Sequence, residues 1–203
     1  MIKFFDRKLQ VSVMQEFIRR IQNARQVNHI IMDRIRPIID EEPLWSRSDQ
    51  SFSIRLAKAE DVPLFIELEN DAYKGFHAWT QQDFKHDWLR NPYCVYILVE
   101  DMTNKEVVAM ISGRFLAKGA HISHLLVREK YQNQRLGSKL LDLWIRLAEI
   151  EEVPIITLEV RESNTIAQNL YYGQDFKKHG IKENYYSDNK ETAFLLKREM
   201  PNA

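Results

Sequence analysis

The 203-residue chain has one cysteine and no surplus of charge, and both features narrow what it can be. Cys94 has no partner within the chain, so neither an intrachain disulfide nor a cysteine cluster that binds zinc can form. Lys and Arg together number 29, as do Asp and Glu, so the chain as a whole has no electrostatic attraction to nucleic acid or membranes. We therefore expect no metal and no direct contact with nucleic acid.

Long apolar segments are also missing. No run of about 18 apolar residues is present that would cross a membrane. Near the N-terminus, Lys3, Asp6, Arg7 and Lys8 interrupt the apolar stretch that a secretion signal needs. We expect a soluble, cytoplasmic protein with no membrane partner. Hydrophobic residues make up 44% of the chain and charged residues 29%, a balance that predicts a folded core.

The first fifty residues differ in pattern from the rest. Apolar residues recur at helical spacing from Met14 to Ile21, and a second short helix is predicted from Val27 to Arg36. Pro37 should end that helix, because proline lacks the N–H that continues the hydrogen-bond ladder. The stretch EEPLWSRSDQ resembles a linker. We predict an N-terminal helical arm over residues 1–49, packed on the main domain or on a partner, and a main domain over residues 50–203.

From Gln50 onward, strand-like and helix-like segments alternate. Their order, β-α-α-β-β-β-α-β-α-β-β, predicts an α/β (α+β) fold in which helices cover a mixed sheet. The predicted strands are SFSIRLA, YCVYILVE, EVVAMISGRFLA, HISHLLV, PIITLEV, FKKHGIKENYY and ETAFLLKRE, and the predicted helices span 61–72, 80–89, 135–150 and 164–172.

A polar turn, YQNQRLGSKLL, follows the strand HISHLLV and opens the longest predicted helix. The start of a helix presents unpaired N–H groups and about half a positive charge, so such a turn is suited to bind a pyrophosphate. Polar turns of this kind also precede many helices that bind no anion, so the turn alone leaves both interpretations open.

Three further segments follow this turn in order: the strand LEVR, the helix start SN-x-x-A-x-x-LY, and NYY near the C-terminus. Together with HLLV and the turn, they resemble the GNAT acyltransferases, which use acetyl-CoA, and more closely the RimI-type ribosomal-protein alanine N-acetyltransferases. The resemblance covers Ser53 to about Met200. It implies a GNAT fold, with a central mixed, mostly antiparallel sheet flanked by helices, here with an N-terminal helical extension.

The same resemblance assigns roles to individual residues. It makes Glu159 a general base that acts through water and Tyr171 the general acid that protonates the departing CoA sulfur. The implied contacts with acetyl-CoA come from Leu125, Leu126, Val127, Asn133, Gln134, Arg135, Leu136, Gly137, Ser138 and Asn164, and those with the acceptor from Trp79, Tyr185 and Tyr186.

Structural roles stay open at the same positions. Glu159 could pair with a neighbouring base such as Arg161, Tyr171 could be a packing residue, and Asn164 could simply cap its helix. Trp79 and the two C-terminal tyrosines could be ordinary core and edge-strand aromatics. For His121 and His124 the structural role is the expected one, since no metal-ligand spacing accompanies them.

Two residues depart from the family pattern. Arg135 stands where the phosphate turn usually has its first glycine, and Asp175 replaces a glycine in LYYGQDF. Aspartate tolerates left-handed backbone better than most residues. A positive φ at Arg135 would cost about 1 kcal/mol or more, whereas a negative φ would cost little and let its guanidinium reach a CoA phosphate. We expect the negative φ.

The sequence supports three functions, and we favour the first. It is direct acetyl transfer from acetyl-CoA to the α-amine of a protein N-terminus, for example of a ribosomal protein. An α-amine with a pKa near 8 costs about 1.4 kcal/mol to deprotonate at pH 7, against about 4.6 kcal/mol for a lysine. The second function is acetylation of a lysine, a polyamine or another small amine. The third is a non-catalytic GNAT-like binding module. Both a monomer and a homodimer are compatible with the sequence.

Overall fold

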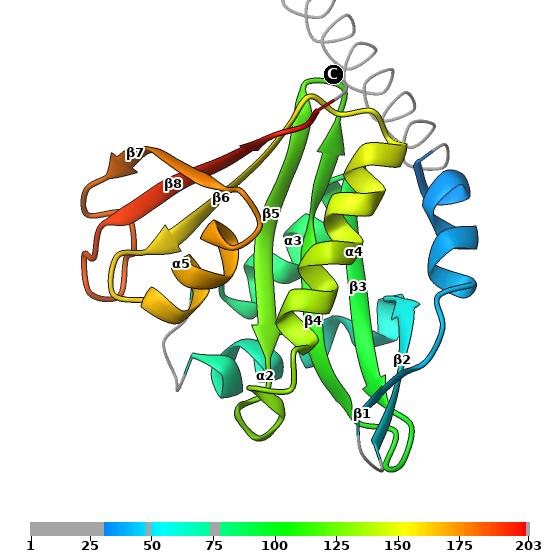
Figure 1. Ribbon diagram of the computed structural model, residues 1–203. Helices are drawn as coiled ribbons and strands as arrows, with labels where there is room; N and C mark the ends of the chain where they lie inside the picture. Colours follow the sequence, from blue (N-terminus) through cyan, green and yellow to red (C-terminus); the bar gives the residue numbers. More distant parts are fainter. Residues whose placement is uncertain (1–30, 48–49, 74–77, 202–203) are drawn as a thin grey trace, which may run out of the picture.

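A computed structural model describes residues 31–47, 50–73 and 78–201 (Figure 1). The apolar segment from Met14 to Ile21 lies outside these ranges. The strands are β1 (Trp45–Arg47), β2 (Gln50–Leu56), β3 (Cys94–Asp101), β4 (Val107–Leu116), β5 (Gly119–Val127), β6 (Ile155–Arg161), β7 (Lys177–Lys182) and β8 (Ala193–Glu199). The labelled helices are α2 (Val62–Ala72), α3 (Gln81–Arg90), α4 (Leu136–Ile150) and α5 (Thr165–Tyr172), with short 3-10 turns at Ala59–Asp61 and Glu129–Tyr131. No helix in the described ranges is long and apolar enough to cross a membrane.

The eight strands of the described ranges form one sheet in the order β1-β2-β3-β4-β5-β6-β8-β7. Only β5 and β6 pair in parallel, and every other pairing is antiparallel. Figure 1 shows α4 on the near face of the sheet and α2 and α3 behind it. The predicted mixed sheet with helices on both faces is therefore confirmed.

Strand β3 separates two apolar cores. Val95, Ile97 and Val99 face the core that contains α4 and α5, while Tyr96 and Leu98 face the core beneath α2 and α3. Side chains alternate across a strand, so a strand covered on both faces must be apolar at every position. This explains why CVYILV, from Cys94 to Val99, is an unbroken apolar run in the sequence.

The predicted apolar stripe of α4 is confirmed. Leu136, Leu140, Leu143, Trp144 and Leu147 are all buried against the sheet. Their spacing of three and four residues places them on one helical face, which is the face that a helix lays on a sheet. The packing of α4 on the sheet thus fixes the position of the polar turn that joins the end of β5 to the start of α4.

The helix of the arm runs through Pro37, so the prediction that it ends there is wrong. Residues 31–40 are helical, and Ile35 and Ile39 on either side of Pro37 are almost fully buried in the core with α4. A proline inside a helix costs about 3 kcal/mol. Burying the two isoleucine side chains contributes about 1.5–3 kcal/mol each, which offsets that cost.

The segment resembling a linker contains a strand. β1 pairs antiparallel with β2, with Trp45 opposite Phe52, and the Trp45 side chain is buried. Arg34 pairs with Glu151 at the end of α4 at 3.3 Å, which fastens the helix of residues 31–40 to the main domain. The described part of the arm therefore packs on the main domain and shares its core. The predicted boundary between an arm of residues 1–49 and a main domain of residues 50–203 stays a proposal.

Candidate active site

β5 and β6 run side by side for three residue pairs and then separate (Figure 1). The last pair joins Ile122 to Leu158, and among the described strands none takes the place of β6 beside the rest of β5. The backbone of residues 123–127 therefore presents N–H and C=O groups on that side with no strand partner. Such an edge can hydrogen-bond an extended ligand as a neighbouring strand would.

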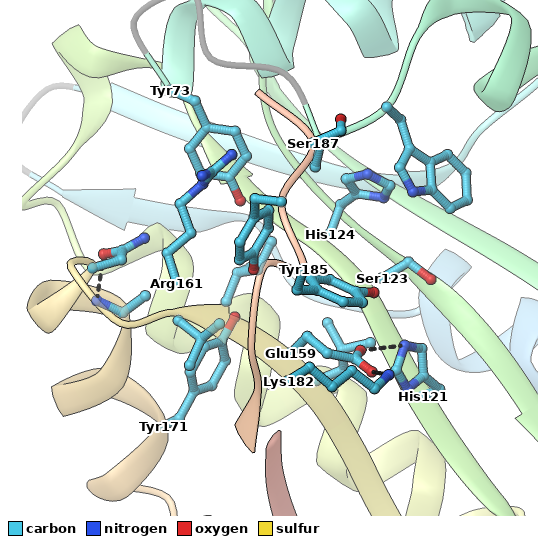
Figure 2. Close-up of a pocket in the computed structure, with 18 of the residues that line it drawn as sticks. Tyr73, His121, Ser123, His124, Glu159, Arg161, Tyr171, Lys182, Tyr185 and Ser187 are labelled. Carbon is cyan, nitrogen blue, oxygen red and sulfur yellow. Dashed lines mark hydrogen bonds and ion pairs between the residues drawn. The ribbon is translucent and has the colours of Figure 1, made fainter. Parts of the chain in front are cut away.

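A cavity of about 480 Å³ lies where the two strands part (Figure 2). β5 and β6 supply two of its walls, α5 a third, and the loop between β7 and β8 supplies aromatic side chains. Its volume is within the usual range for a small-molecule site. The structure brings seven of the predicted site residues together here: Trp79, Leu125, Glu159, Asn164, Tyr171, Tyr185 and Tyr186.

Glu159 is the acidic group in the lining of this cavity. Its Oε2 lies 3.2 Å from Nε2 of His121, and its Oε1 accepts a hydrogen bond of 2.9 Å from Nζ of Lys182. The hydrogen bond from His121, with that from Lys182, outweighs burial and lowers the pKa of Glu159 to about 2. The carboxylate is therefore charged at any physiological pH. Arg161, the structural partner that the sequence suggested, bonds elsewhere.

His121 lines the cavity, although a structural role was expected for it. Its Nδ1 lies 2.9 Å from the hydroxyl oxygen of Thr157 while its Nε2 contacts Glu159. A carboxylate can only accept, so Nε2 carries the proton in this contact. The arrangement depends on the parallel register of His121 with Thr157, which spacing along the chain does not reveal. His124 also borders the cavity, but it is buried, and burial lowers its pKa to about 3.

Tyr171 and Asn164 both lie on α5 and both line the cavity. Burial raises the pKa of Tyr171, so its hydroxyl is neutral and remains a donor at neutral pH. Tyr171 also packs against Phe176 in the core. Asn164 is the N-cap of α5 and accepts the N–H of Ala167 at 3.1 Å. Tyr171 therefore packs in the core and Asn164 caps its helix, and both side chains still border the cavity.

Arg161 holds the loop that covers the cavity. It pairs with Asp188 at 2.8 Å and with Glu191 at 3.2 Å, and its guanidinium lies 3.8 Å from the centre of the Tyr186 ring. Burial raises the pKa of Tyr186. Tyr185 stands edge-on to Tyr186 in the same loop. The tyrosines thus belong to a loop fixed by charge, although this loop lies beyond β7 and not in the strand predicted for NYY.

Trp79 lies at the opposite wall, in the segment before α3. Its ring contacts the rings of His124 and Phe84, so it packs in the core while one side borders the cavity. Glu69 of α2 accepts the backbone N–H groups of Ala78 and Trp79 at 3.0 and 3.2 Å. A buried carboxylate therefore sets the position of this wall.

The expected backbone conformation at Arg135 is wrong. Arg135 is the N-cap of α4 and has φ 64° and ψ 11°, in the left-handed region. The helix begins one residue later than predicted, at Leu136, so Arg135 belongs to the turn. Its side chain is exposed. Asn133 and Asp175 also have positive φ, of 60° and 62°, which asparagine and aspartate tolerate.

The remaining predicted contacts for acetyl-CoA lie outside the lining of the cavity. They occupy the end of β5 and the N-terminus of α4, at Leu126, Val127, Asn133, Gln134, Arg135, Leu136, Gly137 and Ser138. A thioester in the cavity with its pantetheine along β5 would lead to this turn. The unpaired edge of β5 and the helix N-terminus thus fit a long ligand that ends in phosphates.

Comparison with known proteins identifies this architecture. The sequence model of the acetyltransferase (GNAT) family matches residues 62–176, which is more than half of the chain. The chain belongs to the GNAT acetyltransferase family. GNAT enzymes use acetyl-CoA, so the chain is an acetyl-CoA-dependent N-acetyltransferase, and the predicted family and fold are confirmed.

Several GNAT relatives are similar over most of their length. An N-alpha-acetyltransferase of Sulfurisphaera tokodaii is 34% identical over 164 residues, covering 74% of this chain and 95% of the relative. The ribosomal protein bS18-alanine N-acetyltransferase of Escherichia coli K12 is 27% identical over 146 residues, covering 71% and 95%. The crystal structure of the ribosomal-protein-S18-alanine N-acetyltransferase from Escherichia coli superposes with a TM-score of 0.66 at 25% identity, covering 75% and 96%.

Proposed function

We propose that this GNAT enzyme transfers the acetyl group of acetyl-CoA to the α-amine of a protein N-terminus, with a ribosomal protein as the leading acceptor. One observation carries the proposal: an ionised carboxylate, Glu159, borders a cavity that Tyr185, Tyr186 and Trp79 also line. A positively charged chain end suits that carboxylate, and aromatic rings suit the first side chain of a peptide. Relatives named for acetylating a protein α-amine support the same choice.

The donor would lie along the edge of β5. The backbone of Leu125, Leu126 and Val127 would hydrogen-bond its pantetheine amides, and a backbone N–H there would stabilise the developing oxyanion. The turn from Asn133 to Ser138 would hold the phosphates, together with the side chain of Asn164 near the cavity. Bound acetyl-CoA supplies the thioester carbonyl that the amine attacks.

Glu159 would first act as the anchor of the acceptor. An incoming α-ammonium would replace Lys182 at Oε1, because both are cations that need the same carboxylate oxygen. Transfer of the proton to a carboxylate of pKa about 2 from an amine of pKa about 8 is uphill by about 8 kcal/mol. The amine therefore loses its proton to water beside Glu159, and the carboxylate stays charged. This matches a general base that acts through water.

Tyr171 would serve the leaving sulfur. Its hydroxyl is neutral because burial raises its pKa, so it can donate a hydrogen bond as the carbon–sulfur bond breaks. Acetyl transfer is direct between the bound partners, since Cys94 is a buried residue of the other core and offers no acyl-enzyme nucleophile.

A peptide panel tests the proposal. The purified enzyme is given acetyl-CoA with peptides that carry a free N-terminus, with the same peptides blocked at the N-terminus but containing lysine, or with polyamines. We expect CoA release only with free N-termini, and loss of that activity in Glu159→Gln and Tyr171→Phe. Equal or faster acetylation of blocked peptides or polyamines would refute the α-amine assignment.

A further inference from the structure

Lys182 lies at the centre of the proposed acceptor site. It is the last residue of β7, and its Nζ lies 2.9 Å from Oε1 of Glu159 (Figure 2). The same Nζ lies 4.9 Å from the centre of the Tyr185 ring. The side chain is 47% exposed. An amine of this chain therefore already occupies the place that the proposed mechanism gives to the acceptor ammonium.

Other lysines of the described chain have different surroundings. Lys182 alone among the lysines in the described ranges lines the cavity. Lys178, four residues earlier in the same strand, places its Nζ 3.3 Å from the centre of the Phe194 ring. Lys197 pairs with Glu199, and Lys130 pairs with Glu106. Any chemistry that depends on Glu159 and on a bound thioester should therefore distinguish Lys182 from its neighbours.

We propose that Lys182 is itself an acceptor, and that the enzyme acetylates Nζ of Lys182 within the same molecule when no peptide fills the cavity. This inference rests on the proposed function of the Glu159 site. The ammonium of Lys182 loses a proton to water beside Glu159, and the neutral nitrogen attacks the thioester carbonyl carbon. The new C–N bond replaces the C–S bond, the sulfur leaves as the thiol with a proton supplied at Tyr171, and the proton that the nitrogen loses as the amide forms restores the Tyr171 hydroxyl. The products are Nε-acetyl-Lys182 and free CoA.

The reaction is expected to be slow compared with that of a peptide. At pH 7 the neutral form of a lysine is on the order of 250-fold rarer than that of an α-amine, from ordinary pKa values near 10.4 and 8. Glu159 raises the pKa of Lys182 further, which makes the difference larger. A peptide N-terminus therefore outcompetes Lys182, and self-acetylation is confined to enzyme that lacks an acceptor. Its product removes the positive charge that competes with a peptide for Glu159.

Mass spectrometry of the full-length enzyme tests this inference. The protein is incubated with acetyl-CoA alone, its intact mass is followed, and the modified lysines are mapped after digestion. We expect one acetyl group at Lys182 well before any at Lys178, which serves as the matched control in the same strand. The fraction modified per unit time should not change when the enzyme is diluted, because the reaction is intramolecular. Glu159→Gln should slow acetylation of Lys182 without changing that of Lys178, and Lys182→Arg should abolish the early acetyl group.

Several results would overturn the inference. If Lys182 is acetylated no faster than Lys178, or if Glu159→Gln has no effect on it, the site does not act on its own lysine. A rate that falls on dilution would show transfer between molecules and not within one. The same preparation is also assayed with free N-terminal peptides. Acetylated peptide with unmodified Lys182 refutes only the self-acetylation, whereas failure of both refutes the proposed function as well.

Discussion

Arg135 is held in a backbone conformation that glycine would adopt more easily. Its φ of 64° puts an L-residue with a long side chain in the left-handed region, which costs about 1–2 kcal/mol. Glycine at the same position removes that cost but adds about 0.5–1 kcal/mol of chain entropy to the unfolded state. The net expectation for Arg135→Gly is a gain of about 0.5–1 kcal/mol in the free energy of unfolding, or about 2 °C in Tm for a chain of this length.

Urea unfolding of the wild type and Arg135→Gly measures this gain, provided that the m-value is unchanged. Lys105→Gly is the matched control, because Lys105 has φ 61° in the turn between β3 and β4, away from the cavity. Both variants should gain stability by similar amounts. If Arg135→Gly instead loses stability while Lys105→Gly gains it, Arg135 makes a contact in the turn that outweighs its backbone strain, and the reasoning fails.

Binding of acetyl-CoA should move in the opposite direction. The Arg135 side chain is exposed beside the turn proposed to hold phosphates, so its removal should weaken acetyl-CoA binding by about fivefold, corresponding to about 1 kcal/mol. Calorimetric titration at low and high salt checks this, since an exposed charge contact weakens as salt is added. Tighter binding by Arg135→Gly would mean that the arginine obstructs the site.

Three further predictions concern the core, the cavity wall and the reacting amine. Gly113→Ala should cost more than about 3 kcal/mol in urea unfolding, because its Cβ would lie 1.9 Å from the carbonyl oxygen of His121. Gly137→Ala, whose Cβ meets side chains only at 3.6 Å and beyond, should be neutral or stabilising. Burial raises the pKa of Glu69 to about 7, so wild-type stability should fall as pH rises from about 4.5 to 7; Glu69→Gln should remove that fall, which a pH series of unfolding curves would show. The rate kcat/KM should rise about tenfold per pH unit up to pH 8 and then level off, because the α-amine titrates there; a limb that follows Glu159 instead would appear near pH 2.

Much of the fold could be predicted from the sequence because the pattern of apolar residues within each element indicates its type. The stripe from Leu136 to Leu147 predicts α4 from spacing alone, and the apolar run of β3 predicts a strand buried on both faces. Pro37 misled the prediction because the burial of Ile35 and Ile39 comes from a sheet formed by residues far along the chain. A local rule cannot include a stabilisation that arises only after folding.

Contacts that form only on folding also determine which residues make up the site. The family pattern leads to Glu159 and Tyr171 by position, and both line the cavity. His121 and Lys182 stand 38 and 23 residues from Glu159 along the chain, yet the register of β5 and β7 brings both to its carboxylate. Arg135 shows that one residue of uncertainty in a helix start decides the sign of a backbone angle.

The short strand β1 limits aggregation of the protein through the edge of its sheet. It occupies the outer side of β2, and with three residues it leaves little further edge to which another chain could add. A chain that began at residue 50 would present all seven residues of β2 as an open template, beside the apolar patch vacated by Ile35, Ile39 and Trp45. Residues 31–47 therefore complete the core and also cover a strand edge and an apolar patch that would otherwise favour aggregation.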